Sequence, residues 1–115
     1  MSSDCLFCGI VAGEVPANLV AEGEEWVAFR DIDPRAPTHV LVVPRRHLST
    51  LDDLGEQDGP LIGDIVRAAA EIARAEGLVE GGYRVVFNCG AGAGQSVYHI
   101  HLHLLGGRTF SWPPG

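Results

Sequence analysis

The sequence predicts an α+β domain in which short antiparallel strands pack against one long helix. Residues 99–105 alternate histidine with apolar side chains at a period of two, which is typical of a strand with one buried face. Residues 58–77 open on Asp-Gly-Pro and close on glycine, with apolar residues every three or four positions between, which predicts the helix. A chain of 115 residues is enough for one core, so we expect a single domain over residues 1–115.

Short apolar runs separated by turn residues predict the remaining strands, at residues 19–22, 26–29, 38–44 and 83–87. The first two are joined by Gly23-Glu24, which indicates a hairpin. Residues 38–44 are apolar and β-branched, which is typical of a central strand. A short amino-terminal helix is expected to end at residues 9–13, before the turn at Pro16.

Charge and cysteine content exclude several classes of function. A net charge of −7 argues against non-specific binding to nucleic acid or to anionic membranes. The longest aliphatic run, Val40–Val43, is too short to span a bilayer, and Met1–Asp4 shows no basic start of a signal peptide. Three cysteines form no disulfide framework, so we expect a cytoplasmic protein.

The histidines of residues 99–105 predict a functional site. The period of two places His99, His101 and His103 on one face of the strand, and we expect that face to be exposed. One metal held by all three is disfavoured, because the backbones of His99 and His103 would stand about 13 Å apart. The three imidazoles are therefore expected to divide their tasks among metal ligand, nucleophile and proton carrier.

This His-x-His-x-His-Leu-Leu segment resembles the defining motif of the histidine-triad (HIT) family of nucleotide hydrolases and transferases. The flanking segments match as well, and the resemblance runs from Cys5 to the last residue: Asp-Ile-Asp-Pro at 31–34, Ala-Pro-Thr-His at 36–39, Gly-Gln-Ser-Val-Tyr at 94–98, Gly-Gly-Arg at 106–108 and Trp-Pro-Pro-Gly at 112–115. Within the family the chain looks like the histidine-triad nucleotide-binding branch, the purine nucleoside phosphoramidases. The resemblance implies a HIT-like fold that pairs into a homodimer.

The resemblance also implies a reaction, hydrolysis of the P–N bond in purine nucleoside 5′-phosphoramidates of the AMP-amine type. His101 is expected to attack the α-phosphorus and form a nucleotidyl-histidine that water hydrolyses, with no metal needed. Its other ring nitrogen is expected to donate to the carbonyl of His99, and His39 is expected to support the nucleophile. The predicted holders of the phosphoryl oxygens are His103, Asn88, Gly94, Gln95 and Ser96, the last four from a glycine-rich loop that could also be a plain flexible hairpin.

A nucleoside pocket is the second implied site. Asp31 is expected to accept hydrogen bonds from the ribose hydroxyls, although a carboxylate at this position could simply cap a turn. Ile32 is expected to pack against the purine, in a pocket lined by Phe7, Ile10, Phe29 and Leu41. Arg30 stands where family members often carry histidine. Trp112, on the carboxyl-terminal tail, is expected to reach the partner's site in the dimer.

Cys5 and Cys8 form a C-x-x-C pair, which indicates a metal or redox site. A redox motif would follow a strand, and there is no room for one before Cys5. Zinc needs two more ligands, and the resemblance assigns them to His47 and His99, so His99 serves both the triad and a structural zinc site. The alternative is two small buried cysteines without a metal.

Other functions remain open at this point. They are dinucleoside polyphosphate hydrolysis or nucleotidyl transfer in the same family, a non-catalytic nucleotide-binding scaffold protein, and a metal-dependent enzyme on a small β-fold.

Overall fold

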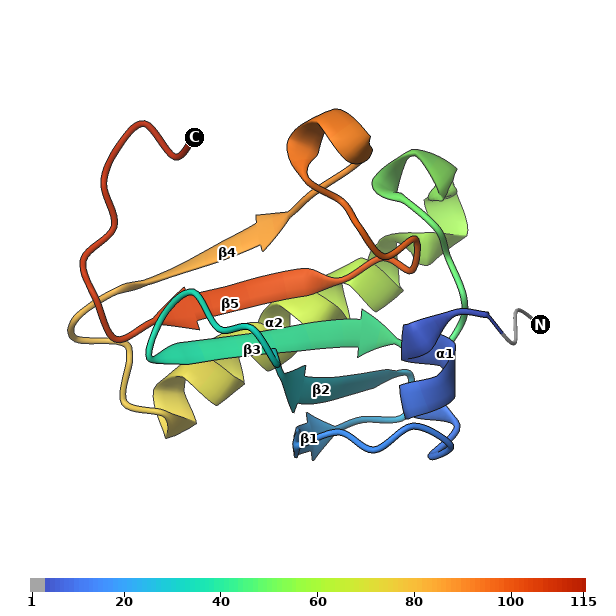
Figure 1. Cartoon of the computed structure of the whole chain (residues 1–115), viewed down its shortest axis with the longest axis horizontal. Helices are drawn as coiled ribbons and strands as arrows, with labels where there is room; N and C mark the ends of the chain where they lie inside the picture. The colour runs from blue at the N-terminus through green and yellow to red at the C-terminus, as the bar shows by residue number, and fades with distance from the viewer. Residues whose placement is uncertain (1–3) are drawn as a thin grey trace.

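A five-stranded antiparallel sheet with the order β1-β2-β3-β5-β4 forms the centre of the molecule (Figure 1). The computed structural model describes residues 4–115, so Met1–Ser3, where we expect no signal sequence, lie outside the described residues. The elements are α1 (Leu6–Val11), β1 (Leu19–Glu22), β2 (Trp26–Arg30), β3 (Thr38–Pro44), α2 (Gly59–Ala75), β4 (Tyr83–Phe87) and β5 (Leu102–Gly106), with short 3-10 turns at Leu51–Asp53, Glu56–Asp58 and Ala91–Ala93. The predicted α+β class is confirmed.

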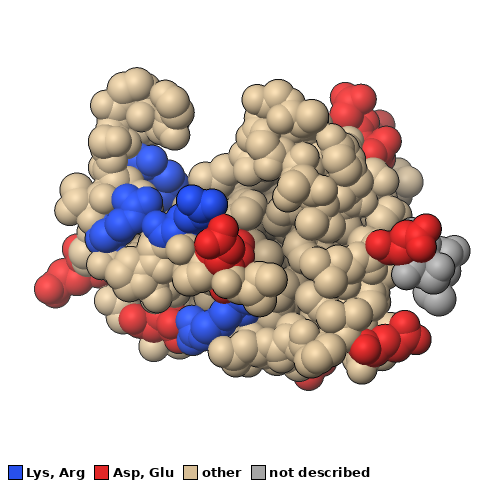
Figure 2. Space-filling model, viewed as in Figure 1, with Lys and Arg blue, Asp and Glu red and all other residues tan. Residues whose placement is uncertain are grey.

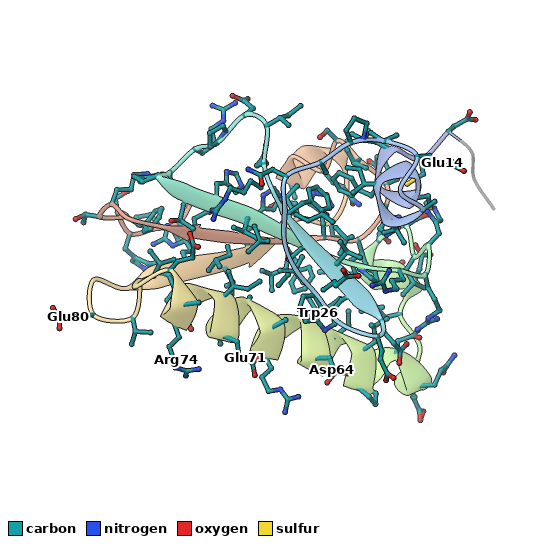
Figure 3. All side chains as sticks on the ribbon, turned by 90° about the horizontal axis from the view of Figure 1, so that it is seen from below. Glu14, Trp26, Asp64, Glu71, Arg74 and Glu80 are labelled. Carbon is teal, nitrogen blue, oxygen red and sulfur yellow. The ribbon has the colours of Figure 1, made fainter. Side chains whose placement is uncertain are left out.

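Helix α2 covers one face of the sheet. It begins after Asp58 with Pro60 in its first turn, and the chain leaves it through Gly77, whose φ of 74° favours glycine. Its buried side chains are Leu61, Ile65, Ala68, Ala69, Ile72 and Ala73. Asp64, Glu71 and Arg74 point away from the sheet (Figure 3). No helix within residues 4–115 combines the length and the apolar character needed to cross a bilayer.

The two central strands present different side chains to the two faces of the sheet. Val40 and Val42 of β3, with Leu102 and Leu104 of β5, pack in the core beneath α2. On the opposite face, Leu41 is paired directly with His103. Helix α1 lies over this second face, where Phe7 packs with Phe29 at 5.4 Å between ring centroids. The histidines therefore belong to the face that α1 partly covers.

The predicted strand over residues 99–105 is wrong at its start, because β5 begins only at Leu102. Ile100 instead donates its N–H to the carbonyl of Leu48, at 2.7 Å, outside the regular ladder. The histidine face is also less exposed than predicted, since His99 is fully buried and His101 is 8% exposed. The cause is α1, whose Phe7 ring packs edge-on against both imidazoles.

The glycine-rich segment between β4 and β5 forms a compact turn. Residues Ala91–Ala93 make one turn of 3-10 helix. Gly90 and Gly94 flank it with φ values of 91° and 94°, which a side chain would strain. The loop therefore has the geometry of a compact 3-10 turn.

Candidate functional site

The ring of His101 is held by the backbone of its own segment. Its Nδ1 lies 2.8 Å from the carbonyl oxygen of His99, so Nδ1 carries the proton and Nε2 keeps its lone pair. The predicted hydrogen bond is confirmed. Among residues 4–115 every buried side-chain nitrogen and oxygen has a hydrogen-bond partner, so Nε2 of His101, which has none, reaches solvent. Burial lowers the pKa of His101, which keeps that lone pair free at neutral pH.

His103 is paired with His39 of β3. Nε2 of His39 lies 2.9 Å from Nδ1 of His103, and Nδ1 of His39 accepts the backbone N–H of Arg35 at 3.0 Å. A backbone N–H can only donate, so the proton of His39 must sit on Nε2. His39 then donates to Nδ1 of His103, and His103 carries its own proton on Nε2. His39, which was predicted to support His101, thus makes its side-chain hydrogen bond to His103.

Both members of this pair are neutral at pH 7. Burial lowers the pKa of His39. Burial, and then the neighbouring His101 and His39, lower the pKa of His103 to about 4. His103 can therefore donate one N–H to an anion without first gaining a proton.

Asp31, His39 and His103 also place one ligand atom each within 4.8 Å of one another, the geometry of a possible metal site. His39 could bind a metal through Nε2 only if its proton moved to Nδ1. That nitrogen already faces the N–H of Arg35, and two donors would then oppose each other. The hydrogen bonding favours a proton-ordered pair over a metal site here.

An apolar pocket of about 160 Å³ lies beside these histidines, between α1, β2 and β3. It brings together Ile10, Phe29, Asp31, Ile32 and Leu41, all predicted for the nucleoside pocket. Phe7 does not line this space and instead packs beneath it against Phe29. The side chain of Ile32 is 96% exposed, so the mouth of the pocket offers a bare apolar surface.

The carboxylate of Asp31 has two different oxygens in this setting. Oδ1 accepts the N–H of Asp33 at 2.8 Å and caps the turn, as the alternative interpretation predicted. Oδ2 lies 3.4 Å from Nε2 of His39 at the edge of the pocket. Nη1 and Nη2 of Arg30, which lines the pocket, donate to the two carboxylate oxygens of Glu76, each at 3.1 Å.

The predicted phosphoryl donors of the glycine-rich loop are only partly available. Oε1 of the buried Gln95 accepts from Gly90, and Nε2 donates to the carbonyls of Ser49 and Val97. The backbone N–H groups of Gly94 and Gln95 bond within the loop, to Ala91 and Gly90. Gln95 and Gly94 therefore brace the loop, contrary to the prediction, because their donors are already used.

Two donors from this part of the chain remain for an anion. Ser96 is exposed, and Asn88 is half-buried at the end of β4. Both side chains can donate to an oxygen without breaking a hydrogen bond of the protein.

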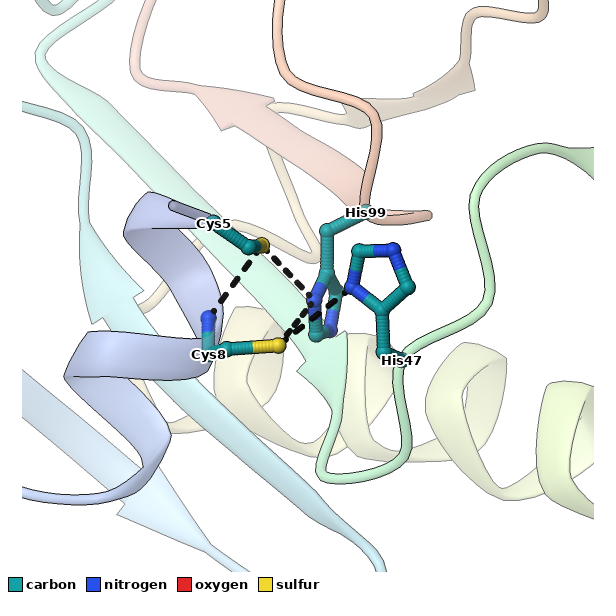
Figure 4. A group of neighbouring side chains, drawn as sticks. All are labelled: Cys5, Cys8, His47 and His99. Carbon is teal, nitrogen blue, oxygen red and sulfur yellow. Dashed lines mark hydrogen bonds between the residues drawn. The ribbon is translucent and has the colours of Figure 1, made fainter. Parts of the chain in front are cut away.

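Cys5, Cys8, His47 and His99 come together from the N-cap and first turn of α1, the loop after β3 and the segment before β5 (Figure 4). Nδ1 of His99 lies 3.3 Å from Sγ of Cys5 and 3.6 Å from Sγ of Cys8, and Nδ1 of His47 lies 3.3 Å from Cys8. Tetrahedral zinc with one sulfur and one imidazole ligand sets these atoms about 3.6 Å apart. The four residues predicted as ligands therefore form a cluster that fits zinc.

The protonation of His99 also suits a metal. Its Nε2 donates to the carbonyl of Pro44 at 2.8 Å, which leaves the lone pair of Nδ1 facing the two sulfurs. Burial, and then the neighbouring Cys5, raise the pKa of Cys8. A dication between the thiols would reverse that effect by stabilising the thiolates.

The carboxyl-terminal tail lies at the end of the sheet away from α1. Arginine side chains gather beneath the tail in the view of Figure 2. Trp112 is 80% exposed, and its ring lies 5.9 Å from the guanidinium of Arg84. No contact among the described residues brings Trp112 to the nucleoside pocket. Its predicted role across a dimer interface stays a prediction.

Sequence reasoning missed several residues of the pocket and one that orients the histidines. Leu6, Val15, Pro16 and Ala17 line the pocket, and no periodicity marks them in the sequence. The N–H of Arg35 orders His39, and a backbone donor has no signature in side-chain patterns. The only signal was the turn-rich composition of residues 31–37, which predicts a loop but not its contacts.

The chain was compared with families, curated proteins and solved structures. The model of the HIT domain matches residues 12–110. A HIT family hydrolase from Legionella pneumophila Philadelphia 1 superposes with a TM-score of 0.95 and is 54% identical, over 97% of this chain and 100% of that one. A histidine triad protein from Clostridium difficile gives a TM-score of 0.93 at 38% identity, over 96% of each chain. The 14 kDa zinc-binding protein of Zea mays is 47% identical, over 98% of this chain and 89% of its own length.

Proposed function

Because this chain belongs to the HIT domain family, whose solved members include a hydrolase 54% identical to it, we propose that it hydrolyses purine nucleoside 5′-phosphoramidates. The observation that carries the proposal is the state of His101. Its Nδ1–H is tied to the His99 carbonyl, while Nε2 keeps a lone pair and reaches solvent. A neutral imidazole held in this way is prepared for nucleophilic attack.

The reaction proceeds in two displacements at phosphorus. Nε2 of His101 forms a bond to the α-phosphorus as the P–N bond breaks, and the leaving amine takes the electron pair and a proton. Water then attacks the same phosphorus and releases the nucleoside monophosphate, which returns the lone pair to Nε2. Ser96, just before the triad, is the proposed source of the proton for the amine in the first displacement, and it regains a proton from the attacking water in the second.

His103 and Asn88 hold the phosphoryl oxygens. His103 presents its Nε2–H because Nδ1 already accepts from His39. Electrostatic stabilisation by such fixed donors usually provides the largest part of the rate enhancement in these transfers. The nucleoside occupies the pocket between Ile10, Phe29 and Leu41, with Oδ2 of Asp31 on the ribose hydroxyls and Ile32 against the purine.

Zinc, in this proposal, is structural and takes no part in the chemistry. Cys5, Cys8, His47 and His99 would hold it and tie α1 to the segment that leads into β5. The zinc-binding name of the Zea mays relative supports this assignment.

The proposal includes a cytoplasmic homodimer. β4 is an edge strand, and its Tyr83 and Val85 are 38% and 40% exposed, so it offers an edge for pairing with a second copy. Trp112 on the tail would then border the partner's pocket. The free cysteines suit a reducing compartment.

The test is to incubate the wild type and His101→Ala with adenosine 5′-phosphoramidate and to follow ammonia release and intact mass. The wild type should turn over and show a nucleotidyl adduct after a rapid quench in alkaline denaturant, because the P–N bond of a nucleotidyl-histidine is labile in acid, and His101→Ala should show neither. His103→Ala, which keeps the nucleophile, should still form the adduct, with turnover reduced about 10²-fold or more. Parental turnover in His101→Ala would refute the proposal.

A substrate panel separates the alternatives. Preferred cleavage of a dinucleoside polyphosphate would indicate the hydrolase or transferase alternative. Tight binding of AMP without turnover of any substrate would indicate a nucleotide-binding scaffold protein.

A further inference from the structure

A line of hydrogen bonds runs from the carboxyl-terminal turn to His103. Nε of Arg108 donates to the carbonyl of Arg35 at 3.0 Å, and the N–H of Arg35 donates to Nδ1 of His39 at 3.0 Å. His39 in turn donates to Nδ1 of His103 at 2.9 Å. The backbone of Arg35 is thus held at both ends, by Arg108 on one side and by His39 on the other.

We propose that Arg108 is a positioning residue that, through the backbone of Arg35 and the ring of His39, keeps the proton of His103 on Nε2. This inference rests on the proposed function, in which that N–H donates to a phosphoryl oxygen. Arg108 touches neither the imidazoles nor the pocket. Its effect on the reaction is confined to the arrangement of protons along this line.

The loop that carries Arg35 needs an anchor from outside. Residues 31–37 form no helix or strand, and their internal contacts include the turn capped by Asp31 and an exposed ion pair between Arg35 and Asp33. An exposed pair of this kind contributes little to order. A backbone N–H in a loop orients a histidine only if the loop itself is held in place.

The turn after β5 is shaped to provide that anchor. Gly107 has a φ of 90°, and a Cβ at this position would come 2.9 Å from Cβ of Pro37, so glycine allows the two segments to pack closely. Arg108 is itself fixed, because Nη1 donates to the carbonyl of Thr109 at 3.0 Å and the guanidinium lies 4.2 Å from the ring centroid of Phe110. The side chain is therefore a rigid donor and not a freely moving surface charge.

Arg84 provides a matched comparison. Its guanidinium lies over the same Phe110 ring, at 5.2 Å, and it donates to the carbonyl of Ser111 in the tail. It carries the same charge in the same neighbourhood, but its hydrogen bond goes to the tail and not to residues 31–37. An effect of charge or of tail packing would follow from removing either arginine, whereas an effect on His103 tautomers should follow from Arg108 alone.

The experiment is two-bond ¹H–¹⁵N NMR of the imidazoles in the ¹⁵N-labelled full chain, for the wild type, Arg108→Ala, Arg108→Lys and Arg84→Ala. In the wild type and in Arg84→Ala, His39 and His103 should each show one protonated Nε2 and one unprotonated Nδ1. Arg108→Ala should give averaged shifts that report both tautomers, with partial recovery in Arg108→Lys, which keeps one donor. Because Arg108 is exposed, thermal unfolding should show all four proteins folded.

Turnover of adenosine 5′-phosphoramidate provides the second measurement. In Arg108→Ala, kcat should fall in proportion to the fraction of molecules that lose the Nε2–H tautomer of His103, roughly two- to tenfold when both tautomers are populated, with KM little changed. Unchanged tautomers in Arg108→Ala, or the same tautomer change in Arg84→Ala, would overturn the inference. If the wild type fails to cleave the phosphoramidate, the proposed function is wrong, and the NMR comparison still decides whether Arg108 orders His103.

Discussion

The half-buried His103 should make the stability of this protein depend on pH in a direction that its environment dictates. Its pKa is lowered from 6.5 to about 4, chiefly by burial. The unfolded chain therefore binds a proton at His103 more readily than the folded one does. The contribution of His103 to the free energy of unfolding is fully present above pH 6.5 and is lost as the pH falls from 6.5 toward 4.

The size of the effect follows from linkage. A shift of this size corresponds to about 2 kcal/mol of stability lost between pH 7 and pH 5, since one unit of pKa is worth about 1.4 kcal/mol. Solvent screening at a half-buried ring reduces the expectation to about 1 kcal/mol. The other titratable groups that face this ring are His39, His101 and Asp31. Because all three are present in both the wild type and His103→Asn, comparing the two proteins isolates the titration of His103.

The assay is urea unfolding of the wild type and His103→Asn at pH 7 and pH 5, at one protein concentration. Asparagine keeps an acceptor for the N–H of His39 but does not titrate. The free energy of unfolding of the wild type should fall by about 1 kcal/mol more than that of the variant between the two pH values. Equal losses in the two proteins would refute the assignment of a neutral, desolvated His103.

Three further predictions concern the metal site, the core and the loop. Cys8→Ala should lower both the zinc content, measured by elemental analysis, and the melting temperature, while kcat of the zinc-free variant stays close to the parental value. Loss of kcat in a folded variant would give zinc a catalytic role. Leu104→Ala, at a fully buried position beneath α2, should cost about 2–5 kcal/mol in urea unfolding, and a smaller loss would mean that the core refills the space. Gln95→Ala leaves Gly90, Ser49 and Val97 without their partner, so it should cost about 1–3 kcal/mol and speed amide exchange at Gly90; unchanged exchange would contradict its bracing role.

The sequence predicted the regular elements well where local pattern and buried face agree. β3 and β4 match their predicted bounds because apolar residues flanked by turn signals leave little freedom in where a strand begins and ends. The start of β5 was wrong because a period of two in the side chains does not show whether the backbone is paired. Continued past Leu102, the register would set Ile100 opposite Pro44, which has no N–H to donate to a ladder, and Ile100 bonds to the loop residue Leu48 instead.

Site residues were predictable where side-chain chemistry alone defines the role. The C-x-x-C pair indicated a metal site by its own chemistry, and the family resemblance added His47 and His99; the four side chains converge in a set that suits zinc. Gln95 shows the limit of this reasoning. An amide beside a catalytic face predicts an anion contact, and only a full account of its three hydrogen bonds shows that its donors are already used.

Three histidines of one motif acquire different capabilities because a different backbone group holds each ring. The carbonyl of Pro44 takes the Nε2 proton of His99 and turns the lone pair of Nδ1 toward the cysteines. The carbonyl of His99 takes the Nδ1 proton of His101 and leaves Nε2 bare, the reverse arrangement. At His103 the position of the proton is set through His39, because Nδ1 of His39 accepts a backbone N–H instead of facing a carbonyl. Nε2 of His103 therefore carries a proton, whereas Nε2 of His101 carries a lone pair. A ring nitrogen with a free lone pair and a ring N–H donor therefore stand side by side without any difference in residue type, and the backbone that surrounds the rings sets which is which.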